Sequence, residues 1–542
     1  MDLTDVDGRL FFTADDGAGE RGLWRADNTG TTAVKLLDFP YNYGSDGRYD
    51  DHGYRALTDV GGTLFFITKT DRTDALWRSD GTKGGTVRIQ RFDDLDSRGG
   101  ENGPSNMAAV GDTLYFTADD GDLWKSDGSK AGTVFVKHIG TGGDENYYYG
   151  PTELTSVGDT LYFVGDDRTG SGSEELWRSD GTAAGTVVVK DIYPGADFHE
   201  GPSRLTVVGD TLYFTADDGV HGRELWTSDG TDAGTVMVED IVPGAESGSP
   251  STLTELGGTL FFGVHDPEDE SRDLWTSDGT AAGTSLVKDF DVDGEGQGYL
   301  PRIVVAGDRM FFFVGVAGGV ELWTSDGTEA GTTLVQGFPL GWNSGGPGEL
   351  TAVGDTLYFY IGGYSVAGAD LWRSDGTAAG TVLVEHIDSP TYGGPGALTA
   401  SGGKLFFAVD DSAHGNELWV SDGTGPGTHL VRDIDPSVMF VSRGARTGAA
   451  NATARVPVTV YSSGTVKVAP ARMGGVRKLR QEIVFDGNWY WDVATLTLDL
   501  TRAARRELRR TGRVEIGARF TYTSCAGPIE TEKRTYTLKK RR

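Results

Sequence analysis

The chain has almost no cysteine and no long apolar run, and both absences narrow what it can be. Cys525 is the single cysteine among 542 residues, which excludes internal disulfides and cysteine-ligated metal sites. We expect Cys525 to be a buried free thiol. The longest apolar run covers residues 310–320, 11 residues, whereas a membrane-spanning helix needs roughly 20. No signal segment opens the chain, as would also be the case for an exported protein whose leader had been removed.

Catalytic signatures are missing as well. The sequence has no HExxH, GxSxG, phosphate-binding loop or zinc-ligand spacing, and its eight histidines are scattered. We therefore expect no catalytic residues, no cofactor and no enzymatic activity.

Positive charge is scarce in the first 434 residues. They hold 28 Lys+Arg against 71 Asp+Glu, a net charge of −43, whereas residues 435–542 hold 21 against 9, a net charge of +12. Such asymmetry indicates two units with different surfaces. The acidic unit would repel phosphate backbones, so we expect no nucleic-acid partner. Its charge favours solubility, or loosely bound divalent cations.

A repeat dominates the acidic unit. The dipeptide Leu-Trp occurs nine times, 47 to 53 residues apart. The tryptophans are Trp24, Trp77, Trp124, Trp177, Trp226, Trp275, Trp323, Trp372 and Trp419.

Each repeat contains four short apolar segments separated by turn residues. In the copy at 205–241 these segments are 205–208, 211–215, 224–227 and 236–238, divided by Gly-Asp, Asp-Asp-Gly and Ser-Asp-Gly-Thr. Segments of this length between glycine and aspartate turns are typical of strands. Four antiparallel strands in about 49 residues is the size of one β-propeller blade.

Leu-Trp places large apolar side chains on both faces of its strand, because neighbouring side chains point to opposite sides. A sheet that is apolar on both faces must be covered on both faces. Radial packing of blades does this, so we expect the nine tryptophans to form the core between blades.

The motif also resembles that of a known family. The strings ELWRSDGT (175–182), ELWTSDGT (321–328) and ELWVSDGT (417–424) are similar to the bacterial ELWxxDGT repeat, and the resemblance covers residues 3 to about 434. It implies a β-propeller-like array in an exported or surface-exposed protein, with no settled activity. The first copy lacks the acid before Leu23, which suits a terminal blade.

The predicted fold is therefore all-β: a propeller of eight or nine four-stranded blades over 1–434, a linker over 435–453, and a small basic β-sandwich over 454–542. We expect a closed ring, because closure hides edge strands. The sandwich resembles small Ig-like domains of secreted bacterial proteins. It contains one helical pattern at 501–510, with Thr501 as N-cap and Gly512 as stop.

Two kinds of segment between blades are candidate sites. Loops rich in aromatic and acidic residues suit sugar or protein contact, although the rings could equally fold back over a blade. Their tyrosines are Tyr41, Tyr43, Tyr49, Tyr54, Tyr147, Tyr148 and Tyr149. Asp291, Asp293 and Glu295 resemble part of a calcium loop but lack its distal glutamate, which favours an ordinary turn.

These observations predict a monomeric, non-enzymatic binding scaffold for a macromolecule or polysaccharide, secreted or on the cell surface. One alternative is a polysaccharide-acting enzyme with unique carboxylates around the propeller axis. Another is a structural scaffold stabilised by calcium.

Overall fold

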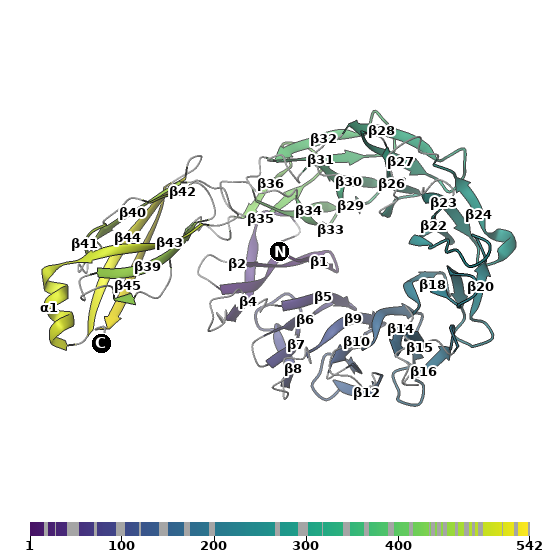
Figure 1. Cartoon of the computed structure of the whole chain (residues 1–542), viewed down its shortest axis with the longest axis horizontal. Coiled ribbons are helices and arrows are strands. Elements are labelled where there is room, and N and C mark those ends of the chain that lie inside the picture. The colour runs from purple at the N-terminus through teal and green to yellow at the C-terminus, as the bar shows by residue number, and fades with distance from the viewer. Residues whose placement is uncertain are drawn as a thin grey trace.

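In the computed structural model the residues that are described are all-β apart from one α-helix and one short 3-10 turn, and nine four-stranded sheets form a ring (Figure 1). The structure describes residues 1–15, 20–27, 29–40, 54–69, 73–93, 103–118, 121–139, 150–166, 174–194, 201–265, 272–290, 302–316, 318–339, 347–362, 368–387, 395–410, 416–432, 434, 439–441, 446–447, 453–460, 464–470, 476–479, 483–485, 492–511, 513–524 and 529–539.

Each blade is one sequence repeat. Blades 1 to 3 consist of β1 (Leu3–Val6), β2 (Arg9–Asp15), β3 (Glu20–Ala26), β4 (Ala33–Pro40), β5 (Tyr54–Val60), β6 (Thr63–Thr68), β7 (Thr73–Ser79), β8 (Val87–Asp93), β9 (Ser105–Val110), β10 (Thr113–Ala118), β11 (Asp122–Ser126) and β12 (Val134–His138). Blades 4 to 6 consist of β13 (Thr152–Val157), β14 (Thr160–Asp166), β15 (Glu174–Ser179), β16 (Val187–Lys190), β17 (Ser203–Val208), β18 (Thr211–Asp217), β19 (Arg223–Ser228), β20 (Val236–Glu239), β21 (Ser251–Leu256), β22 (Thr259–His265), β23 (Arg272–Ser277) and β24 (Ser285–Lys288), with the 3-10 turn η1 (Ala281–Gly283) before β24. Blades 7 to 9 consist of β25 (Ile303–Ala306), β26 (Arg309–Val316), β27 (Gly319–Ser325), β28 (Thr333–Pro339), β29 (Pro347–Val353), β30 (Thr356–Ile361), β31 (Ala369–Ser374), β32 (Val382–Ile387), β33 (Gly396–Ser401), β34 (Lys404–Asp410), β35 (Asn416–Ser421) and β36 (His429–Arg432).

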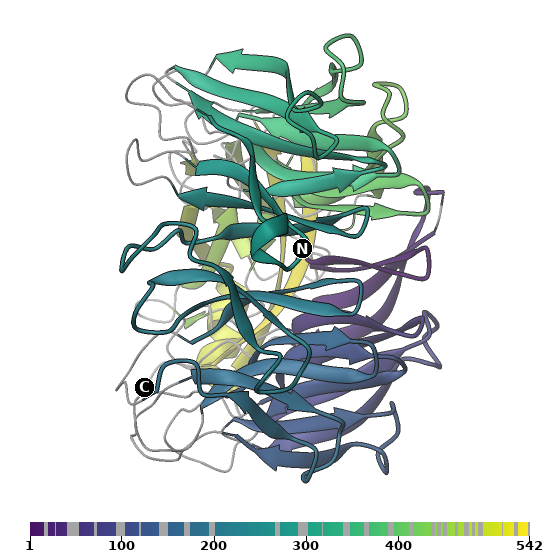
Figure 2. The ribbon, with the colours of Figure 1, turned by 90° about the vertical axis from the view of Figure 1, so that its right-hand side faces the viewer.

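The four strands of a blade are antiparallel and follow one another in sequence order. First strands of neighbouring blades contact each other all around the ring, and β1 contacts β33, so the first strand lies nearest the axis and the fourth at the rim (Figures 1 and 2). Turns from first to second strand and from third to fourth strand therefore share one end of the blades. We call this end the turn face.

The Leu-Trp pair serves both faces of its blade, as predicted. In blade 5, Trp226 packs with Phe214 and with Leu176 of blade 4, whereas Leu225 packs with Leu260 of blade 6. The same division holds in all nine blades, with tryptophan toward the preceding blade and leucine toward the following one. None of the nine indoles is fully exposed.

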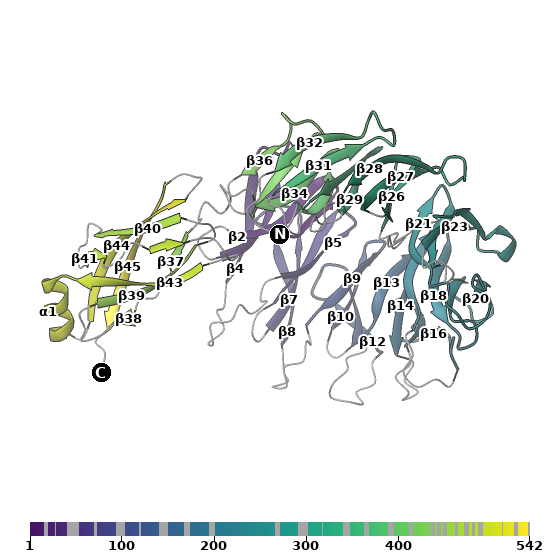
Figure 3. The same ribbon diagram turned by 45° about the horizontal axis from the view of Figure 1, so that its top comes forward.

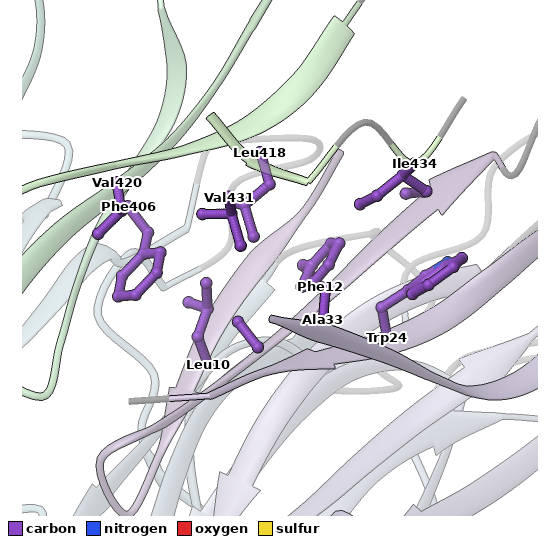
Figure 4. Packing of buried hydrophobic residues seen from close by; sticks show 11 residues of the cluster. Leu10, Phe12, Trp24, Ala33, Phe406, Leu418, Val420, Val431 and Ile434 are labelled. Atoms are coloured by element: carbon purple, nitrogen blue, oxygen red, sulfur yellow. The ribbon is translucent and has the colours of Figure 1, made fainter. Parts of the chain in front are cut away.

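The ring closes without exchanging a strand between its ends. Blade 9 contributes Phe406, Leu418, Val420, Val431 and Ile434 to one apolar cluster with Leu10, Phe12, Trp24 and neighbouring alanines of blade 1 (Figure 4). At this seam Lys404 Nζ donates to the Thr29 carbonyl (2.6 Å), and Arg432 donates to the Ala33 carbonyl (2.7 Å). The atypical first repeat is thus the blade that meets the last one.

The C-terminal unit has two sheets outside the ring (Figure 3). One contains β37 (Met439–Val441), β38 (Arg446–Thr447), β39 (Thr453–Val460), β41 (Val476–Leu479) and β43 (Asp492–Leu500); the other contains β40 (Gly464–Pro470), β42 (Ile483–Phe485), β44 (Arg513–Ser524) and β45 (Ile529–Lys539). The helix α1 (Arg502–Thr511) contacts β44, and its predicted N-cap holds, since Ala504 N donates to Thr501 Oγ1 (3.1 Å).

Part of the segment expected to be a linker belongs to this sheet. The strands β37 and β38 both pair with β39. They have three and two residues, too few for an alternating pattern to be recognised in the sequence.

Candidate ligand-binding site

The Ser-Asp-Gly-Thr turns of the turn face are fixed by their own side chains. In blade 5, Gly230 N donates to Ser228 Oγ (3.0 Å), and the Ser228 and Thr235 hydroxyls are 2.7 Å apart. The backbone N–H and hydroxyl of Thr231 both donate to Asp229 Oδ1 (2.8 Å each). Blades 2 to 9 share the Ser, Asp and Gly contacts, whereas in blade 1 Asp27 accepts from Thr29, Thr31 and Thr32 instead.

These turn aspartates are charged. Hydrogen bonds from the side chain and backbone of the residue two positions later lower the pKa of each in blades 2 to 9. The turn face therefore carries a ring of anionic groups, at Asp80, Asp127, Asp180, Asp229, Asp278, Asp326, Asp375 and Asp422.

Side chains of the preceding blade fill the space beneath most of these turns. Beneath Gly230, for example, lie the Tyr162 hydroxyl and Arg178, which face each other across β14 and β15. Gly230 has φ +85°, a conformation that favours glycine. A Cβ at this position would also clash with the Tyr162 hydroxyl, so only glycine fits.

A pocket of about 640 Å³ opens on the turn face between blades 6 and 7. Its lining residues are Leu256, Gly257, Thr259, Phe261, Thr276, Gly307, Asp308, Asp326, Gly327 and Thr328.

On the side of blade 6 the pocket is lined by Phe261, Thr276 and the residues around the first hairpin. Phe261 and Thr276 stand opposite each other, where blade 4 has Tyr162 and Arg178. The preceding hairpin is Gly257-Gly258, whereas several other blades have Gly-Asp there. The Phe261 ring lies beneath Gly327, but this blade has neither the hydroxyl of Tyr162 nor the guanidinium of Arg178 at the junction.

The lining groups suit a polyhydroxylated ligand. The Asp308 side chain is 97% exposed and accepts hydrogen bonds. Thr259 contributes a hydroxyl group, and the Thr276 hydroxyl, which donates to the Leu260 carbonyl, can still accept. Phe261, which is 5% exposed, contributes an apolar edge to the pocket lining. Blade 7 has the same pair as blade 6, Phe311 opposite Thr324, so this pair in the sequence does not by itself mark the junction that holds the pocket.

Strained residues occur where the first strand of a blade begins. In six blades a non-glycine residue at this point has positive φ, and the pairing with the second strand shifts there. The residues are Ala56, Asn106, Glu153, Arg204, Thr252 and Ala397.

Several side chains at this strand position reach the next blade. Asn106 Nδ2 donates to the Pro151 carbonyl (3.0 Å), and Arg204 donates to the Pro250 carbonyl (3.3 Å). Glu153 Oε2 accepts from Leu205 N (2.9 Å), and in blade 8 the equivalent Glu349 accepts from Leu398 N (2.7 Å). These polar side chains near the axis therefore hold neighbouring blades together.

The acid of the Glu-Leu-Trp motif is a buried structural group. Glu224 is 0% exposed and accepts from Gly248 N (2.8 Å) and Ile241 N (3.3 Å), which fixes the chain as it leaves the blade. Burial, opposed by these hydrogen bonds and assisted by the nearby Asp240 charge, raises the pKa of Glu224 to about 7. In blades 3 and 8 the acid is instead an aspartate paired with a histidine, Asp122 with His138 (2.5 Å) and Asp370 with His386 (2.6 Å).

The loop candidates from the sequence lie outside the described residues. This applies to Tyr41, Tyr43, Tyr49, Tyr147, Tyr148 and Tyr149, to Asp291, Asp293 and Glu295, and to Cys525. The backbone of Tyr54 starts β5. These assignments therefore stay predictions.

Within the ranges that the structure describes, no three or more His, Cys, Asp or Glu side chains are grouped as metal ligands. Calcium binding remains a prediction, and thermal melts with calcium and with chelator would test it. The same ranges contain no helix with the length and apolarity needed to cross a bilayer.

Known proteins resemble the chain only weakly. No protein-family profile and no curated protein matches the chain. Among solved structures, a puromycin hydrolase is 17% identical with a TM-score of 0.38, over 67% of this chain and 58% of that one. Prolyl oligopeptidase B from Galerina marginata is 12% identical with a TM-score of 0.40, over 75% and 55%, and the computationally designed Ika8 protein is 15% identical with a TM-score of 0.36, over 71% and 95%.

The match spans little more than half of the hydrolase and peptidase chains. At these identities and TM-scores the neighbours indicate no specific function for this chain. The ring of nine four-stranded blades defines it as a β-propeller.

Proposed function

We propose that the chain is a non-enzymatic binding scaffold, secreted or displayed on the cell surface, whose pocket between blades 6 and 7 holds a saccharide unit of a larger glycan. The observation that carries this proposal is the pocket itself. It lies beside Phe261 and Thr276, which lack the hydroxyl and the guanidinium that Tyr162 and Arg178 of blade 4 have at the equivalent positions. The exposed Asp308 carboxylate and the threonine hydroxyls around it are groups that can hydrogen-bond the hydroxyls of a sugar.

The pocket's electrostatics favour binding over hydrolysis. Glycoside hydrolysis generally needs one carboxylic acid with a raised pKa beside an ionised one. Here the hydrogen bonds from Thr328 lower the pKa of Asp326 and occupy its carboxylate. Near the axis, Glu153 and Glu349 belong to blades 4 and 8, which are not neighbours, and each accepts a backbone N–H.

The test fills the pocket with residues the protein already uses. The full chain is screened on a glycan array, and the dissociation constant of a bound glycan is measured by calorimetry. Phe261→Tyr with Thr276→Arg reproduces the Tyr162 and Arg178 pair of blade 4, so we expect an intact fold and at least tenfold weaker binding. Phe65→Tyr in blade 2, beside Arg78, adds the same hydroxyl at another junction and should leave affinity unchanged.

Two results would contradict the proposal. One is a wild-type chain that binds no glycan on the array. The other is a filled variant, with an unchanged melting temperature, that binds as tightly as the wild type; this would place the glycan site elsewhere.

A further inference from the structure

The helix α1 carries a stripe of arginines on the side opposite its buried face. Ala504 and Leu508 are buried, and the helix contacts β44. Arg502, Arg506 and Arg509 are exposed. At 100° per residue these three lie about 120° to 180° from the mean direction of the buried pair, and they span roughly 10 Å along the helix axis.

More cationic side chains continue the stripe. Arg510 lies in the last turn of α1 and is bonded to Glu507 (2.9 Å), the one acid of the helix. Arg513 and Lys539 follow at the same end, directly opposite each other on β44 and β45, and both are exposed. Like charges at such spacing repel one another and disfavour the folded unit. An anionic partner would remove this repulsion.

The residue types favour one class of polyanion. Guanidinium groups bind carboxylate, sulfate and phosphate through paired hydrogen bonds. The helix presents no large apolar side chain to solvent that could enter a lipid bilayer, since its leucine is buried. Nor does α1 carry an aromatic residue on which nucleic-acid bases could stack.

We infer that the arginine stripe of α1, with Arg513 and Lys539 beside it, binds an anionic polysaccharide. Figures 1 and 3 place α1 at the end of the C-terminal unit remote from the ring, so a flexible polymer can reach it without crossing the acidic blades. The inference concerns a different surface from the junction pocket and stands independently of the glycan proposed there.

The test measures binding of the full chain to immobilised heparin, a sulfated polysaccharide, at about 50 and 200 mM NaCl. We expect binding that weakens at least tenfold at the higher salt, because screening and counterion release govern such contacts. Arg502→Gln, Arg506→Gln and Arg509→Gln together should weaken binding at least tenfold at low salt. Lysine at the same three positions should keep the affinity within about threefold, since it retains the charge.

A charge-matched control removes three exposed cations of the ring, with Lys83→Gln, Lys130→Gln and Arg302→Gln, and should bind heparin like the wild type. Circular dichroism and thermal melts check folding, and the lysine variant separates lost charge from lost structure. Equal binding by the glutamine variant would overturn the inference. So would tighter binding by the wild type to vesicles with 30% phosphatidylglycerol, or to duplex DNA, than to heparin.

Discussion

At the scale of single residues, the Ser-Asp-Gly-Thr turn is a directed chain of hydrogen bonds. The Thr235 hydroxyl donates to the Thr231 carbonyl (2.7 Å), so it must accept from Ser228, whose oxygen in turn accepts from Gly230 N. Ser228 is 2% exposed and Thr235 is 0% exposed, so water does not substitute for a missing member.

Ser228→Ala should therefore destabilise the protein by about 1–3 kcal/mol, because the Gly230 N–H loses its acceptor in a buried site. Denaturant unfolding measures this change. Asp210→Ala, at the exposed hairpin of the same blade, should change stability by less than about 0.5 kcal/mol. Equal effects of the two substitutions would contradict the role of the network.

Glu224 gives the blade a dependence on pH. Because burial raises its pKa to about 7, the folded chain binds this proton more tightly than the unfolded chain, in which the ordinary value is 4.5. The resulting stabilisation is complete below about pH 4.5 and is lost as the pH rises through 7. A tenfold change in acidity corresponds to about 1.4 kcal/mol, so the loss by pH 8 is on the order of 3 kcal/mol.

Glu224→Gln should abolish this loss, so that unfolding free energies at pH 5 and pH 8 differ less than in the wild type. Glu246→Gln, at an exposed position near the same loop, should leave the wild-type profile unchanged. A Glu224→Gln variant with the wild-type slope would show that another group titrates.

At the scale of the strand, the residues with positive φ at the start of the first strands are of two kinds. In the first kind the side chain reaches the next blade. The strained backbone of Glu153, for example, places its carboxylate where it accepts a hydrogen bond from Leu205 N. Ala397, with φ +56°, has the same backbone but no polar group to aim. Its strain is therefore uncompensated by its own side chain.

Ala397→Gly should accordingly raise the unfolding free energy by about 1 kcal/mol, since glycine adopts this conformation without a Cβ clash. Ala400→Gly, in the same strand without positive φ, should lower it by about 0.5–1 kcal/mol. Thermal unfolding of the two variants gives the comparison. The same sign for both would contradict strain at Ala397.

Features of the fold could be predicted from the sequence where they depend on residues close together in the chain. Four strands per repeat, the Leu-Trp division between faces and the N-cap of α1 were predictable, because local spacing and turn chemistry determine them. The positive φ at the start of the first strands could not be predicted, because Arg204 and Glu153 occupy a left-handed conformation that glycine usually adopts. The burial of Glu224 could not be predicted either, since its partners Ile241 and Gly248 come from the segment that leaves the blade. The junction pocket could not be predicted, because it depends on how side chains of blades 6 and 7 pack against each other.

At the scale of the whole molecule, nine junctions between neighbouring blades form the ring. The sequence alone did not decide between eight and nine blades. Eight junctions join blades that are consecutive in the chain. The ninth, between blades 9 and 1, has no covalent connection and depends on its apolar cluster and on Lys404 and Arg432. Weakening this seam can open the ring, whereas weakening another junction leaves the blades tethered.

A matched pair of phenylalanines separates these outcomes. Phe12 lies at the seam and Phe214 at the junction of blades 4 and 5; both are 0% exposed and stack on the tryptophan of their own blade, at 6.3 and 6.4 Å between ring centroids. Phe12→Ala and Phe214→Ala should each cost about 3–5 kcal/mol locally. Hydrogen–deuterium exchange of Phe12→Ala should accelerate in the seam strands β2, β3, β34 and β35, with a larger radius of gyration in X-ray scattering, because the loose ends can separate. Phe214→Ala should keep the radius and accelerate exchange around its own junction. If both variants expanded alike, or neither did, the seam would be no weaker than a tethered junction, and apolar packing between blades would suffice to hold nine of them closed.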